Sequence, residues 1–462
     1  MSRPVLHPAA LHYVGPEIAR DDSEVRLMLA IHRHGLKRAR GWLDRDFDGL
    51  SQAEAVLLTG LSQPSVSTLA KGLRKRGLLV DGDNGLVLEP AAGIVFGIDI
   101  GFRQVRAIVS DLHGQPLPLE DGEGADFEEF PARLGENVGG TLTWMAETLT
   151  ALEWKARNRG GASKATIIGV GISFAGPVDR ATGKLKRAWD TGGEWELNSV
   201  TAELQQRLGW DTDFIADRDA NASAAAEAFW SRGQGAADVL YCKWAEGGVS
   251  AAITFDHQIY HGSTEIAGEI GHAIVPIRDN DECLPDWFRK RPPCTQCNRQ
   301  GCLRAVTSID ELEIYLKDEG LTAETLVALA GSYDSTKHEE GTREQAARHA
   351  LEAGARCLGR VLVPLIEAFN PKLVILGGKI GANAYPYVSG SLKAGIQEDK
   401  VTPAIDAVDV SRGSLALTGE TSVRGAIALA LIEAAPWRLH ALAQGSEAVV
   451  GSGNGARAAR AL

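Results

Sequence analysis

The chain has 462 residues, enough for two or three domains with a sizeable core. Its hydrophobic content of 44% and charged content of 23% are ordinary for a globular protein in water. No run of about 18 uncharged apolar residues occurs, and the start MSRPVLHPAALHYVG lacks the apolar core of a signal peptide. We therefore expect a cytoplasmic protein without a membrane span.

The charge is unevenly distributed along the chain. The formal net charge of −12, taken alone, disfavours nucleic-acid binding. Residues 23–90, however, contain 10 Lys and Arg against 8 Asp and Glu, whereas the remainder contains 38 against 52. Because whole-chain charge hides a local patch, a mildly basic head on an acidic body is compatible with a DNA-binding unit attached to a second domain.

The head, residues 23–90, has the pattern of three helices followed by a hairpin. Apolar residues at helical spacing behind Ser23 predict the first helix. In SQAEAVLLTGLSQPSVSTLAKGLRKRGLL, Ser51 and Ser62 are N-caps of two helices joined by a tight turn. LLVDGDNGLVLEP then predicts two short strands around a turn at residues 83–85.

The last of these helices has two different faces. One face is apolar, and the other carries short polar and basic side chains suited to base edges and phosphates. The whole arrangement resembles a winged helix-turn-helix DNA-binding domain, whose second helix of the motif enters the major groove. The alternative is a helical protein-interaction domain with solvated basic residues. The DNA-binding interpretation assigns base and phosphate contacts to Gln63, Ser65, Ser67, Thr68, Lys71, Arg74 and Lys75.

Cysteine spacing points to a metal. Six cysteines in a cytoplasmic chain of this length are not expected to form a disulfide framework. Three of them lie close together in CTQCNRQGC and, with one histidine, offer the number and kind of ligands that structural zinc prefers. The alternative is reduced thiols without metal. The four candidate ligands are His272, Cys294, Cys297 and Cys302.

The other cysteines differ from this cluster. Cys242 and Cys357 lie in apolar stretches and are expected to be buried thiols, whereas Cys283 stays unassigned.

The body, residues 94–436, contains two similar units. GIDIGFRQVRAIVSD, residues 97–111, and DVLYCKWAEGGVSAAITFDHQIYHG, residues 238–262, each have the pattern strand, small-residue turn, strand. Two such hairpins followed by helical stretches indicate a duplicated α/β body. This is the pattern of the actin-like ATPase (ribonuclease H-like) fold, in which a nucleotide lies between two halves.

Five further motifs follow in a fixed order: GVGISFAGPVD, IADRDANASAAAEA, AGEIGHAIV, CTQCNRQGCL and NPKLVILGGKIG. Together with the winged head they resemble transcriptional regulators of the ROK family, which comprises sugar-responsive repressors and sugar kinases. The resemblance implies a repressor of carbohydrate metabolism that binds a double-stranded DNA operator as a homodimer or homotetramer. It covers roughly residues 23–435. Outside it lie an N-terminal arm, residues 1–22, and a Gly/Ala-rich tail, residues 437–462, which we expect to be disordered.

The resemblance also implies a zinc site beside the sugar pocket, held by the same histidine and three cysteines. This chain departs from the family spacing in two ways. The first two cysteines are separated by two residues, where one is commoner. The longer segment before Cys294 contains Cys283, a possible substitute ligand. In the head, the insert near residues 36–49 is likewise longer than a minimal domain needs.

A sugar pocket follows from the same resemblance. Carboxylates suit sugars because each accepts two hydroxyl protons. Arg218 stands where the family has Asn, and Arg304 stands where it has Glu. We therefore hypothesise an anionic ligand such as a sugar acid or sugar phosphate. Alternatively, either arginine pairs with Asp217, Asp219 or Glu269. The implied ligand-binding residues are Gly176, Arg218, Asp219, Glu269, His272 and Arg304.

Kinase activity would need a base and two glycine-rich loops, because backbone N–H groups must approach ATP closely. Asp219 matches the base position. The first loop, however, has Phe102 and Arg103 where the family has Gly-Thr, and the second reads EGGVSAAI instead of Gly-Thr-Gly and further glycines. We therefore interpret the chain as a repressor without kinase activity, with Asp219 as a vestigial base. The alternatives are an ATP-dependent sugar kinase with a fused DNA-binding head and a zinc-stabilised sugar-binding module.

Overall fold

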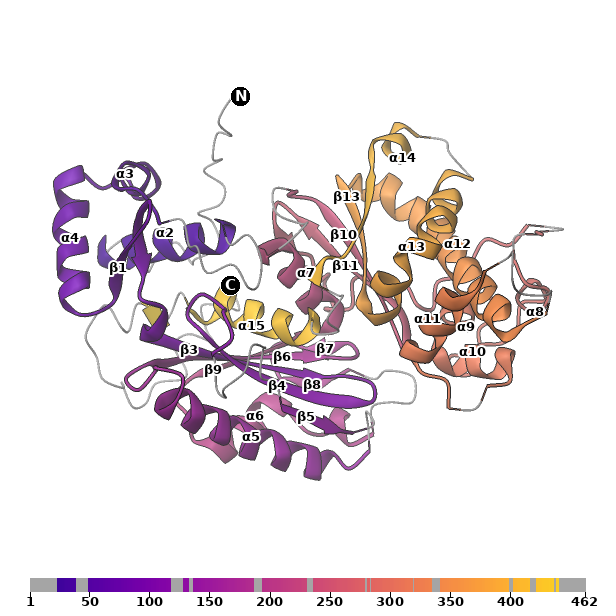
Figure 1. Ribbon diagram of the computed structural model, residues 1–462, viewed down its shortest axis with the longest axis horizontal. Helices are drawn as coiled ribbons and strands as arrows, with labels where there is room; N and C mark the ends of the chain where they lie inside the picture. Colours follow the sequence, from indigo (N-terminus) through magenta and orange to yellow (C-terminus); the bar gives the residue numbers. More distant parts are fainter. Residues whose placement is uncertain are drawn as a thin grey trace.

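The computed structural model places two α/β lobes side by side, with the head beyond one end of the first lobe (Figure 1). It describes residues 23–38, 49–117, 128–132, 136–186, 193–230, 236–278, 281–282, 284–318, 320–334, 341–398, 402–415, 421–435 and 438–439. The N-terminal arm, most of the insert near residues 36–49, Cys283 and nearly all of the tail lie outside these ranges. Within them, no helix has the length and apolar character needed to cross a membrane.

The head contains three helices and a two-stranded hairpin. Ser51 and Glu54 form a reciprocal capping box at the start of α3, and Gly60 ends that helix with φ 69°. Ser62 Oγ accepts a hydrogen bond from the backbone N–H of Ser65 and so caps α4. Strands β1 and β2 pair antiparallel, as the predicted wing requires. The elements are α2 (Ser23–Arg38), α3 (Gln52–Thr59), α4 (Gln63–Lys75), β1 (Leu79–Gly82) and β2 (Gly85–Leu88).

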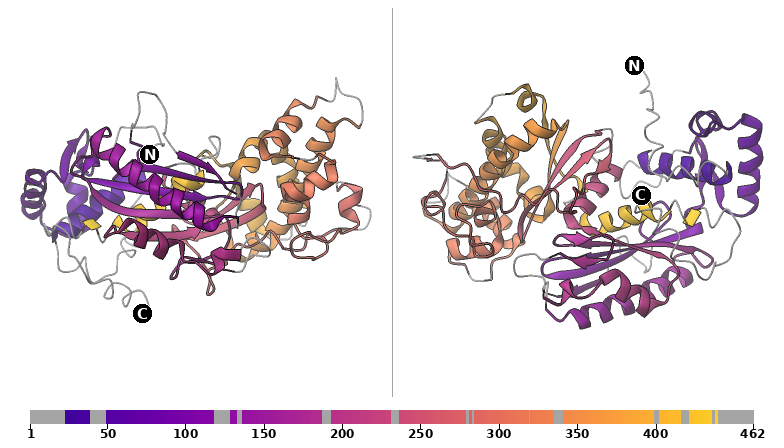
Figure 2. Two further views of the ribbon diagram at one scale, coloured as in Figure 1. Left: turned by 90° about the horizontal axis from the view of Figure 1, so that it is seen from below. Right: turned by 180° about the vertical axis from the view of Figure 1, so that it is seen from behind.

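The first lobe is a five-stranded sheet in the order β5-β4-β3-β6-β9. Strands β3, β4 and β5 are antiparallel neighbours, whereas β6 and β9 run parallel to β3. Helices α5 and α6 cover one face of this sheet and α15 covers the other (Figure 2). The elements are β3 (Gly93–Ile100), β4 (Gln104–Asp111), β5 (Glu128–Pro131), α5 (Val138–Asn158), β6 (Thr166–Phe174), β7 (Val178–Asp179), β8 (Lys184–Leu185), α6 (Val200–Leu208) and β9 (Asp213–Arg218).

The second lobe repeats this topology, in the order β12-β11-β10-β13-β14. Again an antiparallel hairpin is extended by two strands that run parallel to its first strand. The repeat confirms the predicted duplicated, actin-like body. The elements are β10 (Val239–Ala245), β11 (Gly248–Phe255), β12 (Gln258–Ile259), α8 (Asp286–Arg289), α9 (Arg304–Thr307), α10 (Ile309–Leu316), α11 (Ala323–Ser332), α12 (Arg343–Phe369), β13 (Leu373–Gly377), α13 (Gly378–Gln397), α14 (Pro403–Ala407) and β14 (Asp409–Arg412). Cys242 and Cys357 are both fully buried in this lobe, as expected.

Two helices join the lobes. α7 (Asp219–Trp230) leads from the first sheet to the second, and α15 (Thr421–Glu433) returns to the first sheet and packs along α7. α15 approaches β6 so closely that a Cβ added to Gly171 would lie 1.7 Å from the carbonyl oxygen of Ala426. Only glycine fits at that position.

The head packs on α7 and α15, through helix α2. Leu27 and Ile31 of α2 belong to the same buried cluster as Leu431 of α15. In addition, His32 Nε2 lies 3.0 Å from the carbonyl oxygen of Leu431. The head therefore shares a core with the helix that joins the two lobes.

Candidate ligand cleft and metal centre

A cleft with a volume of about 230 Å³ lies between the two lobes. The turns of both hairpins and the first residues of α7, α13 and α15 form its walls. Of the six residues implied to bind a sugar, those that line the cleft are Gly176, Asp219, Glu269, His272 and Arg304. The sixth, Arg218, lies in the wall, with only 1% of its side chain exposed.

Asp219 is held by a lysine that the sequence analysis did not single out. Lys243 Nζ lies 2.5 Å from Asp219 Oδ2 and 2.8 Å from Ser422 Oγ. Only 12% of the lysine side chain and 14% of the aspartate side chain are exposed. The available signal was a single lysine in the otherwise apolar strand VLYCKWA. The candidate kinase base is thus ion-paired.

Asp99 lies in the same wall, at the end of β3. Burial raises the pKa of its carboxyl, although the charge of Lys243 and a hydrogen bond from Ser173 act in the opposite direction. The hydroxyl of Ser173 donates to Asp99 Oδ1 over 2.7 Å. The carboxyl therefore belongs to an internal polar cluster with Lys243.

The two altered loops meet across the cleft. Arg103, in the first hairpin turn, has its Nε 3.4 Å from Glu246 Oε2 in the second hairpin turn. Its Nη2 also lies 3.8 Å from Asp310 Oδ1 at the start of α10. These ion pairs link the two lobes at the position where the fold's phosphate loops face each other.

Arg218 forms hydrogen bonds with the segment that carries Glu269. Its Nη1 donates to Glu269 Oε1 over 2.5 Å, and its Nη2 donates to the carbonyl oxygens of Ala251, at 2.6 Å, and Ala267. Gly268 makes this possible, because its φ is +89° and an added Cβ would lie 2.0 Å from the Ala251 oxygen and 2.8 Å from Arg218 Nη2. The structure thus pairs Arg218 with one of the carboxylates named in the alternative interpretation.

Arg304 also pairs with carboxylates, although not with those named from the sequence. Its Nη2 lies 3.2 Å from Asp310 Oδ2, and its Nη1 lies 3.4 Å from Glu311 Oε1. Its side chain is 6% exposed and lines the cleft beside His272. Neither arginine presents an uncompensated positive charge to a ligand.

The four candidate metal ligands converge. The ligand atoms of His272, Cys294, Cys297 and Cys302 all lie within 4.8 Å of one another. Cys302 Sγ is 3.8 Å from His272 Nδ1, close to the separation of about 3.6 Å that two such ligands have around tetrahedral zinc. The donor set and its spacing therefore fit a zinc ion.

The backbone around this centre also holds it in place. Residues 273–275 and 301–303 run side by side, with Leu303 N–H donating to Ala273 O over 2.9 Å.

In the absence of a metal, burial raises the pKa of the Cys302 thiol to about 12. Because a metal binds the thiolate, a cation at this centre would displace that proton.

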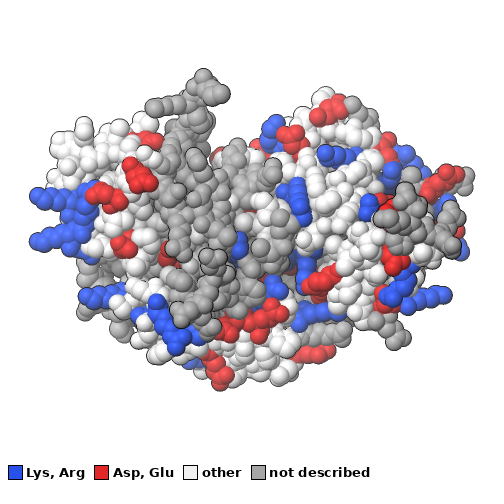
Figure 3. Space-filling view, in the orientation of Figure 1, with Lys and Arg blue, Asp and Glu red and all other residues white. Residues whose placement is uncertain are grey.

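The candidate DNA contacts lie on α4, at the outer end of the head. Lysine and arginine side chains gather at this end of the molecule (Figure 3). The side chain of Ser65 is half-buried at the cap, and Arg74 is half-buried beside Asp81 of the wing, with which it forms an ion pair. The other five residues are exposed: Gln63, Ser67, Thr68, Lys71 and Lys75.

Curated relatives include both repressors and kinases. The xylose repressor of Caldicellulosiruptor bescii is 24% identical over 349 residues, which cover 71% of this chain and 79% of the repressor. The glucokinase of Halalkalibacterium halodurans is 29% identical over 283 residues, which cover 54% of this chain and 80% of the kinase. Similarity to these relatives is thus shared between two activities.

Solved structures with the same fold include a ROK family transcriptional regulator, a homologue of Escherichia coli MLC, with a TM-score of 0.66. It is 16% identical and covers 90% of this chain and 99% of its own. A ROK glucokinase from Streptomyces griseus, solved with glucose and AMPPNP, has a TM-score of 0.51 at 23% identity and covers 72% and 98%. The sequence profile of the ROK family matches residues 95–432. The chain therefore belongs to the ROK family, as its ordered motifs predicted.

Proposed function

We propose that this protein is a DNA-binding transcriptional repressor of carbohydrate metabolism that responds to a sugar in the cleft and transfers no phosphate. The observation that carries the proposal is a pair of features in one chain. The head exposes a polar and basic helix, α4, and the cleft between the two lobes contains an ion-paired candidate base. The similarity to the xylose repressor supports the same function.

The absence of kinase activity is supported by what occupies the nucleotide half of the cleft. A general base must accept a proton from the sugar hydroxyl, yet the Asp219 carboxylate already accepts a hydrogen bond from the Lys243 ammonium at 2.5 Å. The phosphate loops need room for close backbone contact with ATP, whereas Arg103 and Glu246 meet between them. Both features favour ligand binding over phosphoryl transfer.

The ligand that best suits the cleft is a neutral sugar. Asp219 and Glu269 each retain acceptor capacity beside their cationic partner, which suits hydroxyl groups. Neither Arg218 nor Arg304 would offer an anion an uncompensated positive charge, because carboxylates already pair with both side chains. An anionic ligand, such as a sugar acid or sugar phosphate, is the second candidate for the cleft.

The metal proposed is a structural zinc. Held by His272 and the three cysteines, it would cross-link the segment that follows Glu269 to residues 294–302, which precede Arg304. Zinc would supply no chemistry to a substrate here, because four protein ligands complete its coordination. Its contribution is to fix one wall of the cleft.

On the DNA side, we propose that α4 enters the major groove and that the exposed lysines contact phosphates. Two heads are needed to read a two-fold operator, so we propose a homodimer or homotetramer. The acidic body leaves DNA affinity to the head.

Two measurements test the proposal. The first is a gel shift on DNA from the protein's own upstream region, with and without D-xylose, D-glucose and their sugar acids. A sugar-dependent change in affinity is expected. The second is a coupled ATP-consumption assay over the same sugars, which should show no turnover. Turnover would favour the kinase alternative, which is supported by the similarity to a glucokinase.

A further inference from the structure

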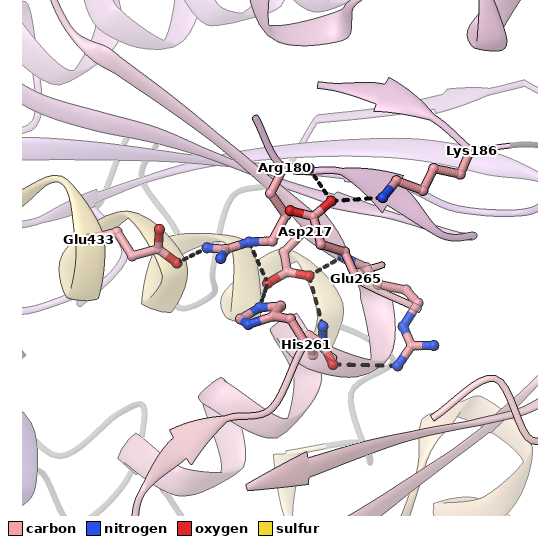
Figure 4. Close-up of polar contacts among 8 residues, drawn as sticks. Arg180, Lys186, Asp217, His261, Glu265 and Glu433 are labelled. Atoms are coloured by element: carbon pink, nitrogen blue, oxygen red, sulfur yellow. Dashed lines mark hydrogen bonds and ion pairs between the residues drawn. The ribbon is translucent and has the colours of Figure 1, made fainter. Parts of the chain in front are cut away.

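A buried polar network extends from the cleft wall to the helix on which the head packs. Its centre is Asp217, the penultimate residue of β9, with 2% of its side chain exposed (Figure 4). The carboxylate accepts hydrogen bonds from the backbone N–H of Arg218, at 2.7 Å, and from Asn221 Nδ2, at 2.8 Å. His261 Nε2 lies 2.8 Å from its other oxygen, and Arg180 Nε lies 3.3 Å from that oxygen.

On the cleft side, the network holds residues 260–272, which connect β12 to the metal centre. His261 contacts Asp217, and Glu265 accepts hydrogen bonds from the Arg180 backbone N–H, at 3.1 Å, and from Lys186 Nζ, at 3.0 Å. Glu269 binds the guanidinium of Arg218. This segment of the second lobe, which carries the candidate sugar carboxylate, is thus fastened to the first lobe.

On the other side, the network reaches α15. The guanidinium of Arg180 donates to Glu433, the last residue of α15 (Figure 4). Two residues earlier, the carbonyl oxygen of Leu431 faces His32 of α2. The continuous path is Glu269, Arg218, Asp217, Arg180, Glu433, α15 and the head.

We propose that this network transmits the state of the cleft to the head, with Arg180 as the positioning residue between Asp217 and Glu433. The inference rests on the proposed function, because it gives that function its route of regulation. Its physical basis is the cost of leaving a buried charge unpaired, which is large compared with the cost of moving the paired groups together.

The chemistry of Asp217 supports this concerted behaviour. Burial opposes its ionisation, but the hydrogen bond from His261 and the charge of Arg180 outweigh burial and lower its pKa. The carboxylate therefore stays charged and needs its donors. When a ligand draws Glu269 and residues 260–272 toward the cleft, Arg180 must follow, and Glu433 and α15 follow Arg180.

The test uses hydrogen–deuterium exchange of the full-length protein and needs neither an operator nor a sugar. Glu269→Gln perturbs the cleft end of the network. It should change amide exchange in α2 and in the last turn of α15 by about threefold or more, while α11 serves as the reference. Glu433→Gln should abolish this effect of Glu269→Gln. Arg180→Lys, which keeps the charge but loses the two-pronged contact, should reduce it.

The matched control is Glu153→Gln. Glu153 pairs with Arg157 on α5 and has 23% of its side chain exposed, compared with 19% for Glu433. In this background the effect of Glu269→Gln should persist. The proposal is overturned if Glu269→Gln leaves α2 unchanged, or if its effect survives in Glu433→Gln. A wild-type protein that failed to bind DNA would refute the proposed function and leave this result intact.

Discussion

The ammonium nitrogen of Lys243 lies 2.5 Å from Oδ2 of Asp219, so the cleft contains a salt bridge at the place where a ROK kinase has its base. The lysine comes from the second lobe and the aspartate from the start of α7. An ion pair there keeps a carboxylate available to accept sugar hydroxyls while it opposes proton transfer to that carboxylate. In the proposed function, this one ion pair would allow the cleft to bind a sugar without phosphorylating it.

This pair should be visible in the free energy of unfolding. Asp219→Asn leaves the Lys243 ammonium without its carboxylate in a site where 12% of the side chain is exposed, and should cost about 3 kcal/mol. Adding Lys243→Met removes the unpaired charge and should restore part of the loss, because Asp99 then lacks the nearby positive charge that offsets its burial. Urea unfolding of both variants measures this. Wild-type stability in Asp219→Asn would contradict the ion-pair assignment.

Gly268 should be as sensitive as the charged residues. A side chain there would meet the Ala251 oxygen and the Arg218 guanidinium, and the φ of +89° is strained for any L residue. We expect Gly268→Ala to destabilise the protein by about 3 kcal/mol and to weaken sugar binding at least about tenfold, since Glu269 loses its partner. Calorimetry with D-xylose and D-glucose and thermal unfolding measure the two effects. Gly139→Ala, which meets nothing within 4 Å, should be near neutral.

Removal of the proposed zinc should loosen the wall of the cleft. Purified protein should contain one zinc ion per chain, measured by mass spectrometry of the metal. Chelation, or Cys297→Ser, should lower the melting temperature by about 5 °C or more, because metal binding adds to folding free energy. Cys242→Ala removes a buried thiol outside the centre and should leave the zinc content unchanged. A metal-free wild-type protein of equal melting temperature would exclude a structural metal.

Local signals were sufficient to predict much of this fold. Serine caps, the turn glycine of the head and the two strand–turn–strand units lie within short stretches, and ordered motifs gave the family and the four convergent ligands. The role of Lys243 was not predicted, because a single lysine in an apolar strand does not reveal which carboxylate it pairs with. Arg218 was assigned to a ligand, yet two of its partners, Ala251 and Glu269, lie 33 and 51 positions away in the sequence. Such pairings depend on how the lobes meet.

The salt dependence of DNA binding should separate phosphate contacts from base contacts on α4. Lys71 and Lys75 are exposed, so replacing either by Ala should weaken binding to all sequences and reduce the slope of log affinity against log salt by about 1. Gln63→Ala should instead alter sequence preference with little change in slope. Duplexes selected from a random pool provide the probe. Lys164→Ala, an exposed lysine of the body, should leave binding unchanged, and an equal loss there would contradict the assignment to α4.

Acid should weaken the junction between head and body. His113 Nε2 lies 2.9 Å from the carbonyl oxygen of Leu88, and burial, with a smaller contribution from His32, lowers the pKa of His113 to about 4. An unfolded histidine has a pKa of about 6.5, so between these two pKa values the unfolded chain binds more protons and stability falls as pH decreases. The difference between pH 7 and pH 5 from this residue should be about 2 kcal/mol. His113→Gln keeps an amide donor for Leu88 and should lose that part of the pH dependence in urea unfolding. Equal pH profiles for the two proteins would show that His113 is not responsible.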